Sequence, residues 1–184
     1  MKPTVVYKLR MDSKWLVWSA VMMGIAFFVQ AFDFIGLRMM QGISIVQMIV
    51  CMILPMLLEA AWCVIIRGNR AEGAKICGII GAALSILLCV QTILGGGIVL
   101  ILIGCGSCLL AGAMLVLVTW GFIPYRHLGF LVLAAVVVIR VLLFGIIDYV
   151  ATLNWTAILL ELPIVCILAS VMFFFGGIYP MKKK

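Results

Sequence analysis

Long apolar runs that alternate with short polar interruptions dominate this chain. Each run is close in length to the ~20 residues that a helix needs to cross a hydrocarbon core about 30 Å thick. The interruptions are rich in glycine, proline, asparagine and basic residues, which is typical of loops. The pattern predicts an all-α polytopic membrane protein with six transmembrane helices, at residues 15–35, 43–66, 76–94, 98–122, 128–150 and 155–178.

These runs form a single predicted six-helix transmembrane domain, residues 15–178. A basic segment, residues 1–14, precedes it and a basic tail, residues 179–184, follows it. The first run is long and is followed by polar residues instead of the small residues of a cleavage site. We therefore expect the N-terminus to be retained.

The basic residues predict the orientation of the chain. Of its 13 lysines and arginines, Arg38 falls in an opposite loop and Arg140 inside a predicted span, whereas all the others lie on the side of the two termini. The positive-inside rule then places both termini in the cytoplasm, which predicts a multi-pass protein of the plasma (cytoplasmic) membrane.

Composition supports the same class. With 67% hydrophobic and 10% charged residues, the chain is far from an ordinary soluble domain. Its net charge of +7 comes from short clusters between apolar runs and not from one continuous basic face. We therefore expect the lipid bilayer as a partner, and no nucleic acid.

Arg140 lies near the centre of the fifth predicted span. A charge at that depth costs from about 2.5 to more than 10 kcal/mol on different scales, so it normally faces the protein interior and has a partner. On helical geometry Arg140 lies roughly 15 Å below the outer surface, Glu161 roughly 9 Å below it, and Glu59 roughly 10 Å from the inner surface. Either glutamate is a candidate partner, and the spacing does not choose between them.

Other polar residues belong to the outer parts of the predicted spans and would line a cavity that opens outward. An arginine below carboxylates and amides suits a small anionic or zwitterionic solute. The candidate substrate-binding residues are Arg140, Glu161, Asp148, Glu59, Gln30 and Gln91. In the alternative interpretation, Arg140 and Glu161 form a structural pair and the glutamines hydrogen-bond between helices.

Small residues recur at four-residue intervals. Such spacing lets helix backbones approach closely, as in the Ala20 and Gly24 pair of the first span. It predicts a tight hairpin of the third and fourth spans, through Cys77, Gly81, Ser85 and Cys89 on one side and Gly104, Cys108 and Gly112 on the other.

Two further patterns have competing interpretations. Gln41, Met48, Met52 and Glu59 lie within about 40° of one another on an ideal helix, with Met56 beside them. Thioethers suit Cu(I), but methionine is also a flexible packing residue, which is the interpretation we favour, so no metal site is predicted. Pro55 in the same span frees a backbone carbonyl and can kink the helix.

Cys105 and Cys108 form a C-x-x-C motif inside an uncharged span, where nothing activates a thiol, so packing is favoured over redox chemistry. The single histidine has no neighbouring carboxylate, and the common hydrolase, zinc-protease and nucleotide-binding motifs are absent from the sequence. We predict no catalytic residues, no cofactor and no enzymatic activity.

The leading functional hypothesis is transport of a small solute, either by an oligomer of this chain or by a larger transporter in which it is the substrate-binding membrane subunit. The first alternative is a non-catalytic membrane assembly protein that docks partner helices on Gly81, Gly104 or Gly112. The second is a membrane thiol oxidoreductase that uses Cys105 and Cys108.

Overall fold

Helices make up most of the described chain. The computed structural model describes residues 8–11, 13–40, 45–68, 71–95, 98–120, 126–140 and 155–181, with residues 142, 146 and 150 as isolated positions. The described elements are, in order, β1 (Lys8–Met11), α1 (Ser13–Met40), α2 (Ile45–Met48), the π-helical turn η1 (Ile49–Ile53), α3 (Leu54–Arg67), α4 (Ala71–Gly95), α5 (Ile98–Thr119), α6 (Arg126–Arg140), α8 (Trp155–Gly177) and β2 (Ile178–Met181).

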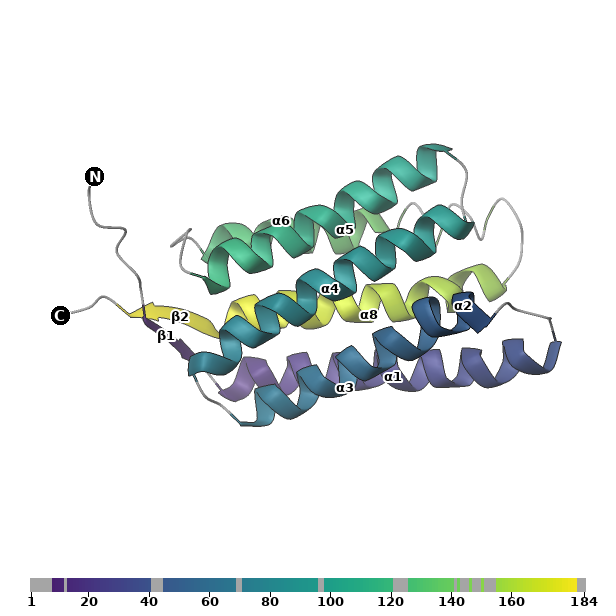
Figure 1. Cartoon of the computed structure of the whole chain (residues 1–184). Helices are drawn as coiled ribbons and strands as arrows, with labels where there is room; N and C mark the ends of the chain where they lie inside the picture. Colours follow the sequence, from purple (N-terminus) through teal and green to yellow (C-terminus); the bar gives the residue numbers. More distant parts are fainter. Residues whose placement is uncertain are drawn as a thin grey trace.

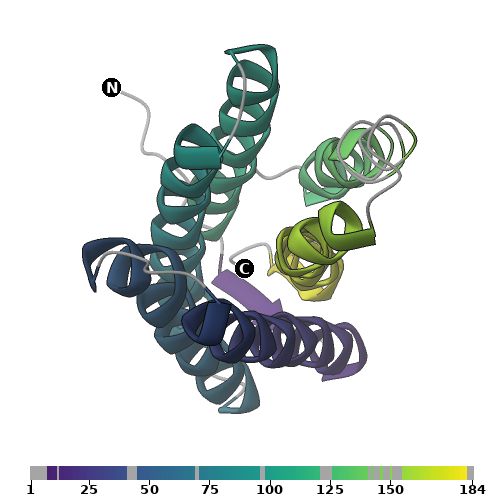
Figure 2. The same ribbon diagram turned by 90° about the vertical axis from the view of Figure 1, so that its right-hand side faces the viewer.

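The long helices lie side by side in one bundle (Figure 1). Viewed from its end, the bundle follows the order of the chain (Figure 2). α1 packs on α3, α3 on α4, α4 on α5, α5 on α6 and α6 on α8, and α8 returns to α1. Short connections produce this arrangement because they force consecutive helices to lie next to each other.

One end of the bundle carries a two-stranded antiparallel ribbon that an all-α prediction does not include. β1 pairs with β2 in the register Lys8 to Met181 and Met11 to Ile178. Pro180 has no amide to donate, and it is tolerated here because a two-stranded ribbon consists only of edge strands. The ribbon holds the chain segments next to the two termini at the same end of the bundle (Figure 1).

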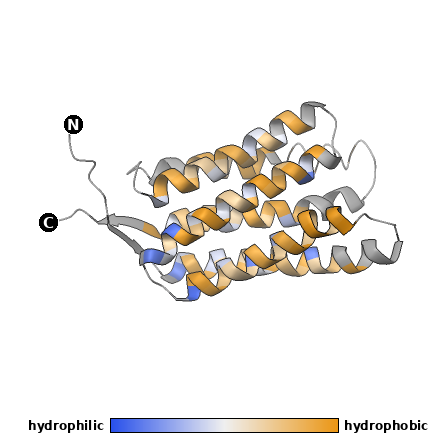
Figure 3. Cartoon of the chain, in the orientation of Figure 1, coloured by the Kyte–Doolittle hydropathy of each residue, from blue (hydrophilic) through white to orange (hydrophobic). Residues whose placement is uncertain are grey.

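The described helices are those of a membrane helical bundle. Within the described residues, Lys14–Phe32, Ile49–Arg67 and Glu72–Ile93 are long and apolar enough to cross a bilayer, and Gly104–Thr119 and Leu162–Gly177 are shorter apolar helices. Hydrophobic residues cover the helices along their length, and polar positions gather near the ribbon (Figure 3). Large side chains such as Phe28, Phe32 and Val64 are 66–75% exposed. A soluble monomer rarely leaves so much apolar surface uncovered.

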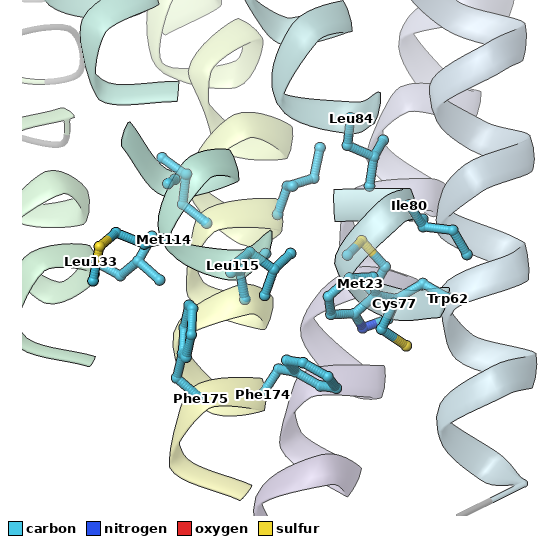
Figure 4. Packing of buried hydrophobic residues seen from close by; sticks show 14 of the residues in the cluster. Met23, Trp62, Cys77, Ile80, Leu84, Met114, Leu115, Leu133, Phe174 and Phe175 are labelled. Carbon is cyan, nitrogen blue, oxygen red and sulfur yellow. The ribbon is translucent and has the colours of Figure 1, made fainter. Parts of the chain in front are cut away.

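The bundle interior is filled by aromatic and aliphatic side chains from different helices (Figure 4). Trp62 of α3 and Phe174 of α8 are both fully buried, and their ring centroids are 4.9 Å apart. Met23, Leu115 and Phe175 are buried around them. Dispersion contacts of this kind drive helix association in a membrane, where lipid chains are as apolar as leucine.

The tight hairpin predicted from small residues is confirmed for α4 and α5. A Cβ added to Gly112 would lie 2.8 Å from the Cβ of Ser85, and one added to Gly81 would overlap the Leu115 side chain. The first-span prediction is wrong for Gly24, where an added Cβ would meet no described atom within 4 Å. Close approach to α8 instead involves Gly176 and Gly177, which lie against Trp15 and Leu16 of α1.

Candidate functional site

Hydrogen bonds between helices fix which residues share a level in the bundle. Trp62 Nε1 donates to Ser19 Oγ at 3.2 Å, and Ser170 Oγ donates to the Ser19 carbonyl at 2.7 Å. All three side chains are fully buried. They join α1, α3 and α8 at one height along the bundle axis, which we call the serine level. Positions along each helix can be counted from the serine level at about 1.5 Å per residue.

Gln91 binds the helix that contains Pro55. Its Nε2 donates to the carbonyl of Cys51, across the contact between α4 and η1. That carbonyl lies four residues before Pro55, where a helix normally uses the amide that proline lacks. The freed carbonyl predicted from the sequence is therefore supplied with a side-chain donor. Gln91 makes the interhelical hydrogen bond that the alternative interpretation of the glutamines expects.

Gln30 lies at the same level on α1. It is 11 residues beyond Ser19, as Cys51 is 11 residues before Trp62 on the antiparallel helix, so both lie about 16 Å from the serine level. The Gln30 side chain is only 6% exposed, and its Oε1 has no hydrogen-bond partner among the described residues. An acceptor buried without a donor costs about 1–3 kcal/mol, which a bound donor would recover.

The helix positions of Glu161 and Arg140 fall near this level too. Glu161 lies nine residues before Ser170, or about 13 Å along α8, and α8 is adjacent to both α1 and α6. Arg140 ends α6, about 21 Å from its start at Arg126. Glu161 lies about 24 Å from the end of α8 at Gly177, and Glu59 about 12 Å from the end of α3 at Arg67, so both carboxylates stay candidate partners of Arg140.

We call the set of Gln30, Cys51, Gln91 and helix positions 140 and 161 the polar layer. It receives residues from five neighbouring elements: α1, η1, α4, α6 and α8. Asp148 and the side chains of Arg140 and Glu161 lie outside the described residues.

Glu59 is at a different level from the polar layer. It lies three residues before Trp62, about 4–5 Å from the serine level. Its side chain is fully buried, and neither carboxyl oxygen has a hydrogen-bond partner among the described residues. The carboxyl is close enough to the thiols of Cys63 and Cys166 to interact with both electrostatically. Glu59 is therefore separate from the other predicted site residues.

The helix face predicted to carry Gln41, Met48, Met52 and Glu59 does not continue along the second predicted span. The π-helical turn η1 separates Met48 from Glu59, and such a turn adds about one residue and rotates the next part of the helix by about 100°. Met52 lies within η1, and Met48, Met52 and Met56 are only half-buried, whereas Glu59 is fully buried. No group of three His, Cys, Asp or Glu side chains suited to a metal occurs in the described part of the chain.

The thiols of the C-x-x-C region take part in helix packing. Cys105 Sγ donates to the Cys89 carbonyl and Cys89 Sγ donates to the Cys105 carbonyl, both at 3.6 Å. Cys108 of the motif is fully buried. These reciprocal contacts join α4 to α5.

Two of the three glycines predicted to dock partner helices instead contact other residues of this chain. Gly81 and Gly112 contact Leu115 and Ser85 in the hairpin of α4 and α5. A bulky substitution at either residue would therefore disturb this chain before it reached a partner. Gly104 is buried as well.

Sequence reasoning did not identify the serine level. Ser19, Ser170 and Trp62 carry no charge and form no motif, and each lies in a different predicted span. The available signal was a tryptophan inside a span, since its indole N–H requires an acceptor wherever it is buried.

Comparison of the chain with protein-family models, with curated proteins and with solved structures gives no match.

Proposed function

We propose that this chain is a small-solute transport protein, or the substrate-binding membrane subunit of a transporter, with its solute site in the polar layer. The observation that carries the proposal is the buried, unpartnered Oε1 of Gln30 at a level shared with Gln91 and with helix positions 140 and 161, among the residues that the structure describes. Polar groups inside a membrane bundle are costly, and they commonly mark a substrate or ion pathway.

The residue types favour a zwitterionic solute within the anionic or zwitterionic class expected from the sequence. A guanidinium at position 140 would pair with a carboxylate of the solute. The Gln30 oxygen and the carboxylate of Glu161 are acceptors for an ammonium group. An anion alone would leave both acceptors unused.

The proposal also includes the number of spans, the side on which the termini lie and the membrane that holds the protein. Six spans would place both termini in the cytoplasm of a plasma-membrane protein, in agreement with the excess of basic residues on that side. The antiparallel ribbon supports an even number of spans, since it holds β1, which precedes the first helix, and β2, which follows α8, at one end of the bundle.

The test is ligand-induced stabilisation of the purified full chain, with the proteinogenic amino acids as zwitterionic probes and succinate and phosphate as anionic probes. A ligand at 100 times its Kd stabilises the folded state by about 2.7 kcal/mol, which raises the Tm measurably. We expect at least one amino acid to raise the Tm of the wild type. This shift should disappear in Gln30→Leu and in Arg140→Ala.

Ser107→Ala is the matched control, because Ser107 is half-buried and donates within its own helix, to the Gly104 carbonyl at 2.8 Å. It should keep the wild-type shift. A panel in which no solute stabilises the wild type, or in which Gln30→Leu and Arg140→Ala respond as the wild type does, would contradict the proposal.

A further inference from the structure

Glu59 is a buried acid that the proposed solute site does not use. It is 0% exposed, and both of its carboxyl oxygens lack a hydrogen-bond partner among the described residues. It lies about 12 Å from the polar layer along the bundle. Its role therefore depends on its own surroundings.

Those surroundings contain no described cation. On α3 the nearest titratable group is Cys63, α8 contributes Cys166, and α4 contributes Cys77, which interacts with Cys63. α1 has no titratable residue from Trp15 to Phe32. The described basic side chains Lys14, Arg67 and Lys75 are exposed near the ribbon end of the bundle.

An ionised carboxylate in such a place would lose its hydration without gaining a partner. The cost of that exchange is so large that buried acids adopt the neutral form instead. A neutral carboxyl needs only modest compensation, and the thiols and apolar side chains around Glu59 place no charge against it.

We propose that Glu59 is a proton-binding site, whose carboxyl holds a proton in the closed bundle and releases it when the interface of α1, α3 and α8 admits water. On release the O–H bond breaks, its electron pair stays on the carboxylate oxygen, and the proton passes to water. Pro55, one turn before Glu59, and η1, which ends two residues before Pro55, give this helix a point at which to bend. The site goes beyond the proposed solute binding and does not depend on it.

Infrared spectroscopy of the full chain in lipid nanodiscs tests the proton directly, since a neutral carboxylic acid has a carbonyl stretch that a carboxylate lacks. At about pH 8 an exposed glutamate is ionised. We expect the neutral-acid band in the wild type and in the control Glu72→Gln, because Glu72 is exposed on the first turn of α4. The band should be lost in Glu59→Gln.

A wild type without this band, or a Glu59→Gln variant that keeps it, overturns the proposal. Glu59→Gln should also retain the wild-type Tm within a few degrees, because it replaces one neutral group by another of the same shape. A large drop in Tm would instead indicate an ionised Glu59 paired with a cation, and would overturn the proposal as well.

A second measurement needs no variant. A hydrophobic carbodiimide reacts with a protonated carboxyl inside a membrane: the acid proton moves to a carbodiimide nitrogen as the carboxyl oxygen bonds to the central carbon. Mass spectrometry of the labelled wild type should find the adduct on Glu59 and not on Glu72. Labelling that omits Glu59 contradicts the proposal.

Discussion

At the scale of single residues, glycines determine how closely α4 and α5 approach, because a glycine has no side chain to keep the helices apart. Gly112 faces Ser85, and an added Cβ would lie 2.8 Å from both the Cβ and the Oγ of Ser85. The Ser85 Cβ is bonded directly to the backbone and cannot rotate away, so the helices themselves would have to separate. Gly106 of α5 is exposed, and a Cβ there would meet no described atom within 4 Å.

Gly112→Ala should therefore destabilise the chain, while Gly106→Ala serves as its control on the same helix. We expect Gly112→Ala to lower the free energy of unfolding by about 1–3 kcal/mol, as overpacking usually does. Gly106→Ala should stay within about 0.5 kcal/mol of the wild type. Unfolding in detergent mixtures measures both, and equal effects would refute the tight packing of α4 on α5.

Single residues also show which packing features can be predicted from the sequence and which cannot. The spacing from Gly81 to Ser85 predicted the contact surface of α4, because small residues four apart must share a face. The same spacing was wrong for Gly24, since spacing identifies a small face but not whether a neighbouring helix covers it. Only the three-dimensional packing could provide the hydrogen bonds of Ser19 with Ser170.

At the scale of elements, α2, η1 and α3 form one helix interrupted before its proline. The interruption is stabilised from outside, by the hydrogen bond from Gln91 to the Cys51 carbonyl. The sequence predicted the break, because proline always removes one donor. It could not predict that the break takes the form of a π-helical turn, which shifts the faces of the helix on either side.

A double-mutant cycle tests this arrangement. Gln91→Leu should cost about 0.6–1.7 kcal/mol of stability, the range for interhelical hydrogen bonds in membranes. In a Pro55→Ala background the cost should fall toward zero, because the restored amide can donate to the Cys51 carbonyl. The free energy of unfolding of the four proteins gives the coupling, and strictly additive effects would show that Gln91 does not compensate for Pro55.

At the scale of the whole molecule, the closed ring of helices and the ribbon bring residues 8–11 and 178–181 together at one end of the bundle. The basic residues of the sequence predict that both termini lie on one side of the membrane, which stays a prediction, whereas the pairing of β1 with β2 had no signal in the apolar pattern. Strands of four residues carry too few alternating positions to stand out from a loop.

The proposed orientation can be read from cysteine accessibility. A membrane-impermeant maleimide should label Arg38→Cys in intact cells, and Arg67→Cys or Lys75→Cys only after permeabilisation, since the last two lie at the ribbon end. The native cysteines all lie in helices, and the unsubstituted chain provides the background. Labelling of Arg67→Cys in intact cells would reverse the orientation.

The ring also implies an order of assembly during synthesis. Every helix from α1 to α6 finds a partner next to it in the sequence, so each hairpin can pack soon after it enters the membrane. The seam between α1 and α8 is different, because the hydrogen bond of Ser19 with Ser170 joins residues 151 positions apart. A nascent chain therefore carries α1 with one flank exposed to lipid until α8 is synthesised and packs against it.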